Sequence, residues 1–204
     1  MSILAGKMTL RSVGEAFTHA LGVRFGERLT GGEIIVLIGD LGTGKTTFVR
    51  GLAEGLGADP TEVTSPTFLR VQEYEGRVAL HHVDAYRFEG GAEEFRAYGG
   101  DELLEDGGVT VIEWGDRLFK ALPESFLTLR FAHGEGENER TIRLLPRGVR
   151  YAGLAVGVLR ETMSAHGEAL GEALASERPT AAPDEAPDEA PGEAPDETPG
   201  ETPR

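Results

Sequence analysis

Apolar residues in the first part of the chain recur in two patterns, one typical of helices and one typical of strands. Residues 13–29 carry an apolar residue at every fourth position, and charged residues lie between them, which predicts an amphipathic helix. Its apolar stripe consists of Val13, Phe17, Leu21, Phe25 and Leu29. Residues 34–38 are all apolar and predict a buried strand. Residues 46–57 return to helical spacing, and Gly57 favours the end of that helix.

The rest of the chain continues this alternation of strands and helices. Residues 68–74 and 77–83 predict two strands, and the two-residue turn between them makes the pair antiparallel. The elements predicted downstream are short helices in 92–106, a strand in 109–112, a helix in 116–122, a hairpin of 126–132 with 140–145, and a helix in 149–175. Whether the last helix packs on the preceding elements is left open. The alternation is typical of an α/β fold.

Composition divides the chain into three parts. The length of 204 residues with 39% hydrophobic residues favours a single core, which we assign to residues 1–147. Residues 148–178 are expected to form a C-terminal helical extension. From Pro183 to Pro203 a proline occurs at every fourth position between acidic residues, so residues 179–204 are expected to form a disordered tail.

The chain is acidic, with a formal net charge of −15, and residues 179–204 contribute −7 of it through eight acids and one arginine. Because binding to nucleic acid depends on Lys and Arg that neutralise phosphates, the chain is not expected to bind RNA or DNA on its own. The absence of cysteine excludes disulfides, thiol catalysis and thiolate metal sites. No apolar stretch is long enough for a signal peptide or a membrane span, so we expect a soluble, cytoplasmic protein.

Residues 39–46 match the phosphate-binding pattern G-x-x-x-x-G-K-[ST], the Walker A motif, between a predicted strand and a predicted helix. In such a loop the glycines let the backbone surround a phosphate, Lys45 reaches the outer phosphates, and the Thr46 hydroxyl can ligate Mg²⁺. Lys45 is informative because the chain has three lysines against seventeen arginines. The expected nucleotide-binding residues are Gly39, Gly42, Thr43, Gly44, Lys45, Thr46 and Thr47. The alternative is a glycine-rich turn that binds nothing.

Two further predicted strands end in a carboxylate, at Asp84 and Glu113. Ligands of an open α/β sheet bind outside the carboxyl ends of its strands, so both acids meet Lys45 and Thr46 at one edge if the strands are parallel. Mg²⁺ on a nucleotide needs one hydroxyl and one or two carboxylates from the protein. Glu113, after the more apolar run, is the better candidate, either to hold a metal-bound water or to polarise the attacking one.

Three residues close to these acids each allow two interpretations of their role. His82 is either catalytic or a buried wall residue of the strand, and the second reading is favoured. Arg87 either reaches a phosphate or pairs with a neighbouring acid. Trp114, the only tryptophan, packs either near the nucleotide or in the core.

Together these motifs resemble the TsaE (YjeE) family, the small ATPase of bacterial tRNA threonylcarbamoyladenosine biosynthesis. The resemblance covers roughly residues 8–146, starting from Thr18 and Gly22 in the first helix. Its most specific elements are His82-x-Asp84-x-Tyr86-Arg87 and Glu113-Trp114, and it also includes the phosphate-binding loop with its Asp40 and the segment Ser65-Pro66-Thr67-Phe68. Thr43 departs from the family, which usually has Ala at that position.

The resemblance implies a P-loop NTPase-like, three-layer α/β fold with a mixed parallel and antiparallel sheet. Thr46 and Glu113 then resemble the Mg²⁺ ligands, with Asp84 close to the metal and the γ-phosphate, so Lys45, Asp84 and Glu113 are the expected catalytic residues. Residues 65–68 resemble a segment that responds to nucleotide, and Arg140 is placed near the nucleotide.

The family's activity is partner-dependent hydrolysis of ATP, with Mg²⁺ as cofactor. It resets a complex with other protein subunits that carry out the threonylcarbamoyl transfer. Those subunits, rather than this acidic chain, would hold the tRNA, so its contact with tRNA is expected to be indirect.

Two other functions stay open: a small-molecule kinase and a non-catalytic adaptor whose partner binding is gated by nucleotide. The Arg-rich lid typical of such kinases is not evident in the sequence. GTP is not the expected substrate, because Asn138 is the only asparagine and no NKxD base-reading motif can exist. ATP is therefore the expected nucleotide.

Overall fold

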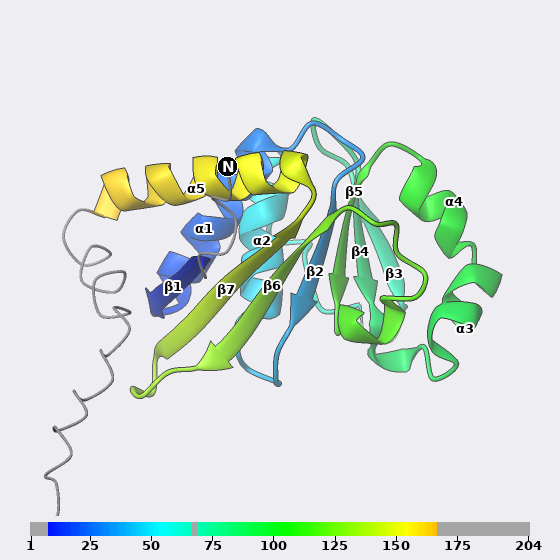
Figure 1. Ribbon diagram of the computed structural model, residues 1–204, viewed down its shortest axis with the longest axis horizontal. Helices are drawn as coiled ribbons and strands as arrows, with labels where there is room; N and C mark the ends of the chain where they lie inside the picture. The colour runs from blue at the N-terminus through cyan, green and yellow to red at the C-terminus, as the bar shows by residue number, and fades with distance from the viewer. Residues whose placement is uncertain (1–7, 67–68, 167–204) are drawn as a thin grey trace, which may run out of the picture.

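Residues 8–66 and 69–166, which the computed structural model describes, form an α/β fold around a seven-stranded mixed sheet (Figure 1). In spatial order the strands are β1 (Met8–Val13), β7 (Glu139–Arg147), β6 (Phe126–His133), β2 (Ile34–Ile38), β5 (Val109–Glu113), β4 (Leu80–Asp84) and β3 (Val71–Tyr74). β6, β2, β5 and β4 are parallel, whereas β7 is antiparallel to β1 and β6, and β3 is antiparallel to β4. The predicted α/β class with a mixed sheet is confirmed.

Helices pack on one face of this sheet and at its β3–β5 end. α1 (Glu15–Arg28) and α2 (Lys45–Gly55) pack together on one face, where the rings of Phe48 and Phe131 meet edge to face with centroids 6.0 Å apart. The segment between β4 and β5 contains the 3₁₀ turn η1 (Ala85–Arg87) and the helices α3 (Gly91–Ala97) and α4 (Gly100–Glu105). Together with the 3₁₀ turn η2 (Gly115–Leu118), this segment lies at the β3–β5 end of the sheet (Figure 1).

α1 and α2 approach each other so closely that their backbones touch. A Cβ added at Gly22 would lie 2.2 Å from the carbonyl oxygen of Phe48, and one added at Gly51 would lie 2.0 Å from that of His19. Such distances are far below any normal contact, so only glycine permits this packing. The helix that begins at the phosphate-binding loop is therefore held firmly against α1.

α5 (Val149–His166) packs at the end of the sheet opposite to the carboxyl ends of β2, β5 and β4 (Figure 1). The Tyr151 hydroxyl accepts a hydrogen bond of 2.8 Å from the backbone N–H of Ile34, the first residue of β2. Further along α5, Glu161 forms an ion pair with Arg28 at the end of α1. The docking of this helix, which the sequence left open, is thus observed over residues 149–166.

Three local expectations are corrected by the structure. The chain has a strand, β1, that was not predicted, and Val13 is the last residue of that strand, 64% exposed, instead of part of the helix stripe. The helix expected at 116–122 is only the 3₁₀ turn η2. The strand expected from residue 68 starts at Val71, and the strand expected from residue 77 starts at Leu80, so the turn between Tyr74 and Leu80 is longer than two residues.

The remaining expectations concern parts that the structure does not describe. Residues 1–7, 67–68 and 167–204, which include the end of the last predicted helix and the expected tail, lie outside the described residues. None of the described helices is long and apolar enough to cross a membrane.

Candidate functional site

The loop that follows β2 lies at the carboxyl ends of the parallel strands. Its glycines adopt backbone angles that other residues avoid: φ is 152° at Gly39 and 98° at Gly44, the residue before α2. A Cβ at Gly39 would lie 2.4 Å from the carbonyl oxygen of Phe131, so this position is restricted to glycine by space as well. The loop thus leads directly into the N-terminus of α2, whose free N–H groups form a general binding site for anions.

Lys45, the first residue of α2, turns its side chain back toward the loop. Its Nζ donates hydrogen bonds to the carbonyl oxygens of Gly39 (2.6 Å) and Asp40 (2.8 Å) and lies 4.2 Å from the ring centroid of Trp114. Burial lowers the pKa of Lys45 below its ordinary value, although the carboxylates of Glu113 and Asp84 oppose this effect. A buried ammonium group whose hydrogen bonds go to backbone carbonyl oxygens is well suited to meet a phosphate.

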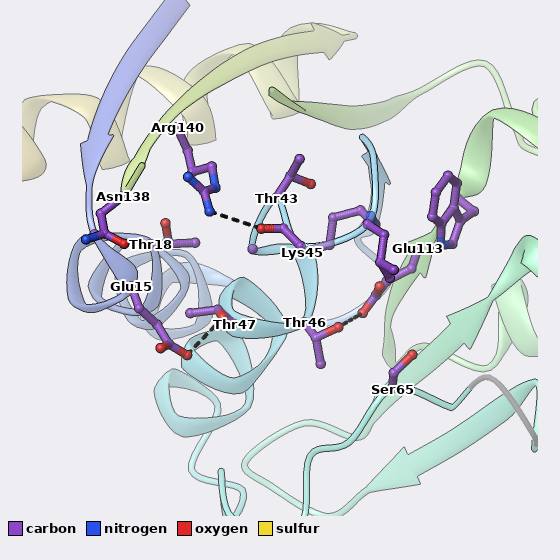
Figure 2. Close-up of a pocket in the computed structure, with 15 residues that line it drawn as sticks. Glu15, Thr18, Thr43, Lys45, Thr46, Thr47, Ser65, Glu113, Asn138 and Arg140 are labelled. Carbon is purple, nitrogen blue, oxygen red and sulfur yellow. Dashed lines mark hydrogen bonds between the residues drawn. The ribbon is translucent and has the colours of Figure 1, made fainter. Parts of the chain in front are cut away.

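Thr46 and Glu113 meet at the centre of the site (Figure 2). The Thr46 hydroxyl donates a hydrogen bond of 2.8 Å to Glu113 Oε1, and the same oxygen lies 3.0 Å from His82 Nε2. Burial raises the pKa of Glu113, but the hydrogen bond and charge of His82, the Thr46 hydroxyl and the Lys45 charge lower it by more. The net pKa lies below its ordinary value, so Glu113 is a buried carboxylate at neutral pH.

Asp84 lies beside Glu113, but its carboxylate makes different contacts. The two residues are paired in register at the ends of β4 and β5, as predicted from the strand-end rule. However, the Asp84 carboxylate accepts the backbone N–H of Tyr86 at 2.9 Å and caps the turn η1. Its carboxylate is buried and does not line the pocket formed by the described residues.

A pocket of about 390 Å³ opens in front of the loop (Figure 2). Of the predicted binding residues, Gly42, Thr43, Gly44, Lys45, Thr46 and Thr47 line it, together with Glu113 and Trp114. Gly39 does not line the pocket, but its backbone carbonyl oxygen accepts the hydrogen bond from Lys45 Nζ. The Thr43 hydroxyl donates a hydrogen bond of 2.8 Å to the carbonyl oxygen of Asp40. The pocket therefore contains the residues expected to contact phosphates and metal.

The far wall of the pocket was mostly missed by the sequence analysis. It consists of Gly14, Glu15, Thr18, Asn138 and Arg140, which come from the β1–α1 junction and the β6–β7 hairpin. Arg140 Nη2 donates to the carbonyl oxygen of Gly42 at 3.2 Å, and the Thr47 hydroxyl donates to Glu15 at 3.2 Å (Figure 2). Arg140 was expected near the nucleotide, and Thr18 was noted only as a family match. These residues lie at the same edge of the sheet because β1, which was not predicted, pairs in register with β7.

The structure shows where His82, Trp114 and Arg87 lie, the three residues for which the sequence allowed two interpretations. His82 is fully buried, as expected of a wall residue, yet it contacts Glu113 directly. Trp114, with a left-handed backbone (φ 56°), lines the pocket and also packs, partly buried, against the core, so both interpretations hold in part. Arg87 lines a different pocket with Arg70. Ser65 lines the main pocket, whereas residues 67–68 of the proposed nucleotide-responsive segment lie outside the described residues.

The donor set suits Mg²⁺ better than a transition metal. Thr46 and Glu113 offer hard oxygen ligands, and Mg²⁺ bound through phosphates completes its octahedron with water and phosphate oxygens. The described residues hold no cluster of three or more His, Asp or Glu side chains that could bind a metal ion without such help. The site thus fits a metal that arrives with a polyphosphate.

Comparison with known proteins gives a consistent family. The model of the family "Threonylcarbamoyl adenosine biosynthesis protein TsaE" matches residues 13–142. The chain is 43% identical over 126 residues to the tRNA threonylcarbamoyladenosine biosynthesis protein TsaE of Treponema pallidum, covering 61% of this chain and 92% of that protein. It is 41% identical over 145 residues to the protein of the same name from Streptomyces coelicolor, covering 68% and 97%, respectively.

A solved structure has the same fold. The crystal structure of YdiB from Bacillus subtilis superimposes with a TM-score of 0.61 at 30% sequence identity, covering 78% of this chain and 99% of that chain. The superposition extends to nearly all of that chain, so the arrangement of sheet and helices is shared and not only the phosphate-binding loop.

Proposed function

The chain belongs to the TsaE family, and on that premise we propose that it is the Mg²⁺-dependent ATPase of the bacterial machinery that makes threonylcarbamoyladenosine in tRNA. The observation that carries the proposal is the convergence of Lys45, Thr46 and Glu113, from two elements far apart in sequence, on one pocket of nucleotide size. Hydrolysis would drive turnover of the partner subunits that perform the transfer, in the cytoplasm.

Each residue has a specific role in this proposal. The loop backbone and the N-terminus of α2 bind the phosphates. Lys45 exchanges the carbonyl oxygens of Gly39 and Asp40 for the outer phosphate oxygens, and burial makes that charge pair stronger than one exposed to solvent. Mg²⁺ supplies neutralisation of the charge that develops on the outer phosphates. Thr46, whose hydroxyl donates to Glu113 in the structure, would hold the metal through its hydroxyl oxygen.

Glu113 is the proposed catalytic carboxylate. Its hydrogen bond with Thr46 holds its carboxylate beside the hydroxyl that would ligate the metal, and its lowered pKa keeps it ionised. It then ligates the metal or orients the attacking water as an acceptor. Asp84, on the neighbouring strand, adds negative charge near the metal and keeps η1 in place.

The far wall of the pocket supports ATP as substrate. Asn138 is the only asparagine of the sequence, so the NKxD motif that reads guanine cannot be present. The pocket beyond the loop is lined by Glu15, Thr18, Asn138 and Arg140, and we propose that the nucleoside lies on this side. We assign adenine to this space.

The acidic chain is proposed to act on tRNA only through its partners. The net charge of −15 disfavours direct binding to RNA phosphates, so the other subunits of the transferase complex hold the tRNA. The resulting activity is expected to be low for the isolated chain and higher with these subunits.

The proposal is tested by ATP hydrolysis of the purified chain, alone and with the partner subunits. Lys45→Ala is expected to abolish hydrolysis, whereas Lys120→Ala, which removes a lysine from outside the pocket, is expected to leave it unchanged. In cells, Lys45→Ala should lower threonylcarbamoyladenosine in tRNA, and an unchanged level would refute the proposed pathway. A phosphorylated small molecule as product would indicate a kinase, and equal function of wild type and Glu113→Ala would indicate a nucleotide-gated adaptor.

A further inference from the structure

One face of the sheet carries arginines that no described helix covers. In β1, β7 and β6, residues alternate between the face that packs on α1 and α2 and the opposite face, and the register pairs Arg130 with Arg143 on the opposite one. The same alternation places Arg11 and Arg147 there. We call these four residues the arginine face. In Figure 1 no described helix lies in front of β6 and β7, which form most of it.

The arginine face is poor in opposite charge. Arg130 and Arg143 are directly opposite each other on neighbouring strands, an arrangement that is unfavourable unless an anion lies between them. Glu139 forms an ion pair with Arg11 at the margin. Within residues 8–66 and 69–166, no carboxylate forms an ion pair with Arg130, Arg143 or Arg147, and Nε of Arg143 is buried without a hydrogen-bond partner.

Arg130, Arg143 and Arg147 thus gather positive charge on one face of an acidic chain. Arg147 lies over the rings of Phe126 and Phe119 and is thereby fixed at one end of the face. Fixed arginines lose less side-chain freedom when they bind an anion, which makes the face a better anion site than mobile surface arginines.

The chain itself contains the matching negative charge. Residues 179–204 carry eight carboxylates against one arginine, and most of the carboxylates come as pairs that repeat every four residues, such as Asp184-Glu185 and Asp188-Glu189. Four residues of extended chain span about 12–14 Å, whether in a polyproline or a strand conformation. Arg143 and Arg147 are four residues apart on β7, so they have the same spacing.

The attachment point makes this contact possible. α5, the last described element, packs against α1 and β7, the latter a strand of the arginine face. Residues 167–204 follow it, and ten extended residues already reach about 33 Å. A tethered segment is present at an effective concentration in the millimolar range, so weak ion pairs suffice.

We propose that the acidic repeats of residues 183–201 dock on the arginine face of the same molecule and shield it from other polyanions. The prolines at every fourth position prevent this segment from adding a strand to the sheet, so the contact rests on charge and is sensitive to salt. The shield explains how a protein with an arginine-bearing sheet face is kept from binding RNA. The arginine face lies outside the nucleotide pocket, and docking on it does not depend on ATP hydrolysis.

The location of the contact can be measured by paramagnetic relaxation. The chain has no cysteine, so Ala194→Cys in the full-length protein accepts a single spin label. At low salt the label is expected to broaden the amide signals of Arg130, Thr141 and Arg143 at least several-fold more than those of α3 and α4. The broadening should disappear at about 1 M salt, where the Debye length is about 3 Å. Broadening elsewhere, or none, overturns the proposal.

Matched variants test the role of the arginines. Arg130→Gln with Arg143→Gln should abolish the broadening, whereas Arg96→Gln with Arg160→Gln, the same change in net charge on other elements, should preserve it. Loss of broadening in both pairs would refute a specific site. Isotope-labelled protein without the spin label, mixed with unlabelled spin-labelled protein, should show no broadening, and broadening in this mixture would refute docking within one molecule.

Binding to a polyanion gives an independent test of the shield. The full chain with its eight tail acids changed to Asn or Gln should be retained on immobilised heparin and elute at higher salt than the wild type. Adding Arg130→Gln and Arg143→Gln to this variant should remove the gain. Equal elution of wild type and the neutral-tail variant would show that the tail covers nothing.

Discussion

Thr46 and Glu113 are 67 positions apart in sequence, yet the hydroxyl of one donates a 2.8 Å hydrogen bond to the carboxylate of the other. The contact joins the first turn of the helix after the phosphate-binding loop to the end of the neighbouring parallel strand. It brings together a hydroxyl and an ionised carboxylate, which are oxygen ligands of the kind that Mg²⁺ prefers. The contact also predicts which single changes separate nucleotide binding from hydrolysis.

Glu113→Gln is expected to bind ATP but to hydrolyse it about 100-fold more slowly or worse, because the amide keeps the shape and loses the acceptor charge. Binding is checked by calorimetry and hydrolysis by phosphate release in the presence of the partner subunits. Glu105→Gln, at the exposed end of α4, is the control and should match the wild type. A hydrolysis rate unchanged in Glu113→Gln would remove Glu113 from the mechanism.

His82→Leu is expected to raise the Mg²⁺ concentration needed for half-maximal hydrolysis by roughly 10–100-fold, since His82 contacts the carboxylate that we propose as the metal ligand. His82→Gln, which can still donate to Glu113, should retain more of the activity than His82→Leu. The control is His81→Gln, because His81 pairs with Asp106 and not with Glu113. Equal Mg²⁺ dependence in all variants would show that His82 is only part of the wall.

Stability should depend on pH through Glu113. Its folded-state pKa is below the ordinary value of 4.5, so ionised Glu113 stabilises the fold fully above about pH 4.5, and this contribution is lost as the pH falls through the folded-state pKa. Urea unfolding from about pH 7 to about pH 4 should therefore show wild type losing stability relative to Glu113→Gln only at the acidic end. A constant difference would mean that the pKa of Glu113 is the same in the folded and unfolded chain.

The sequence was sufficient to predict the half of the site that depends on local motifs. Lys45 and Thr46 lie inside one short loop pattern, and the positions of Asp84 and Glu113 follow from the rule for strand ends. The direction of the Asp84 carboxylate did not follow, because it depends on the turn at Tyr86, which only the folded backbone defines.

The other half of the site was not predicted, because the spacing of apolar residues was misinterpreted at the boundary between β1 and α1. Val13 continues the four-residue spacing of α1, so it was assigned to a helix, although it ends β1. β1 itself alternates buried and exposed residues but buries Ser12, whose hydroxyl lies 2.8 Å from that of Thr18. A buried polar residue breaks the apolar alternation on which strand prediction relies. The pocket wall near Glu15 was therefore not foreseen.

Gly51→Ala is expected to destabilise the protein by roughly 1–3 kcal/mol or more, although alanine favours helices over glycine by about 1 kcal/mol. The reason is the backbone of α1, since the new Cβ would lie 2.0 Å from the carbonyl oxygen of His19. Gly153→Ala in α5, where a Cβ meets no atom within 4 Å, is the control and should be neutral or slightly stabilising. Urea unfolding compares the two variants. Equal stability of both would contradict the tight packing of α1 on α2.

Tyr151→Phe is expected to lower the free energy of unfolding by roughly 1–3 kcal/mol, because the buried N–H of Ile34 loses the hydroxyl that accepts its hydrogen bond. Tyr98→Phe, which changes a half-exposed tyrosine, should stay within about 0.5 kcal/mol of wild type. α5 lies at the end of the sheet away from the pocket, so the rate of ATP hydrolysis well below the unfolding temperature should be the same in both variants. A Tyr151→Phe variant with wild-type stability but lower activity would instead connect α5 to the site.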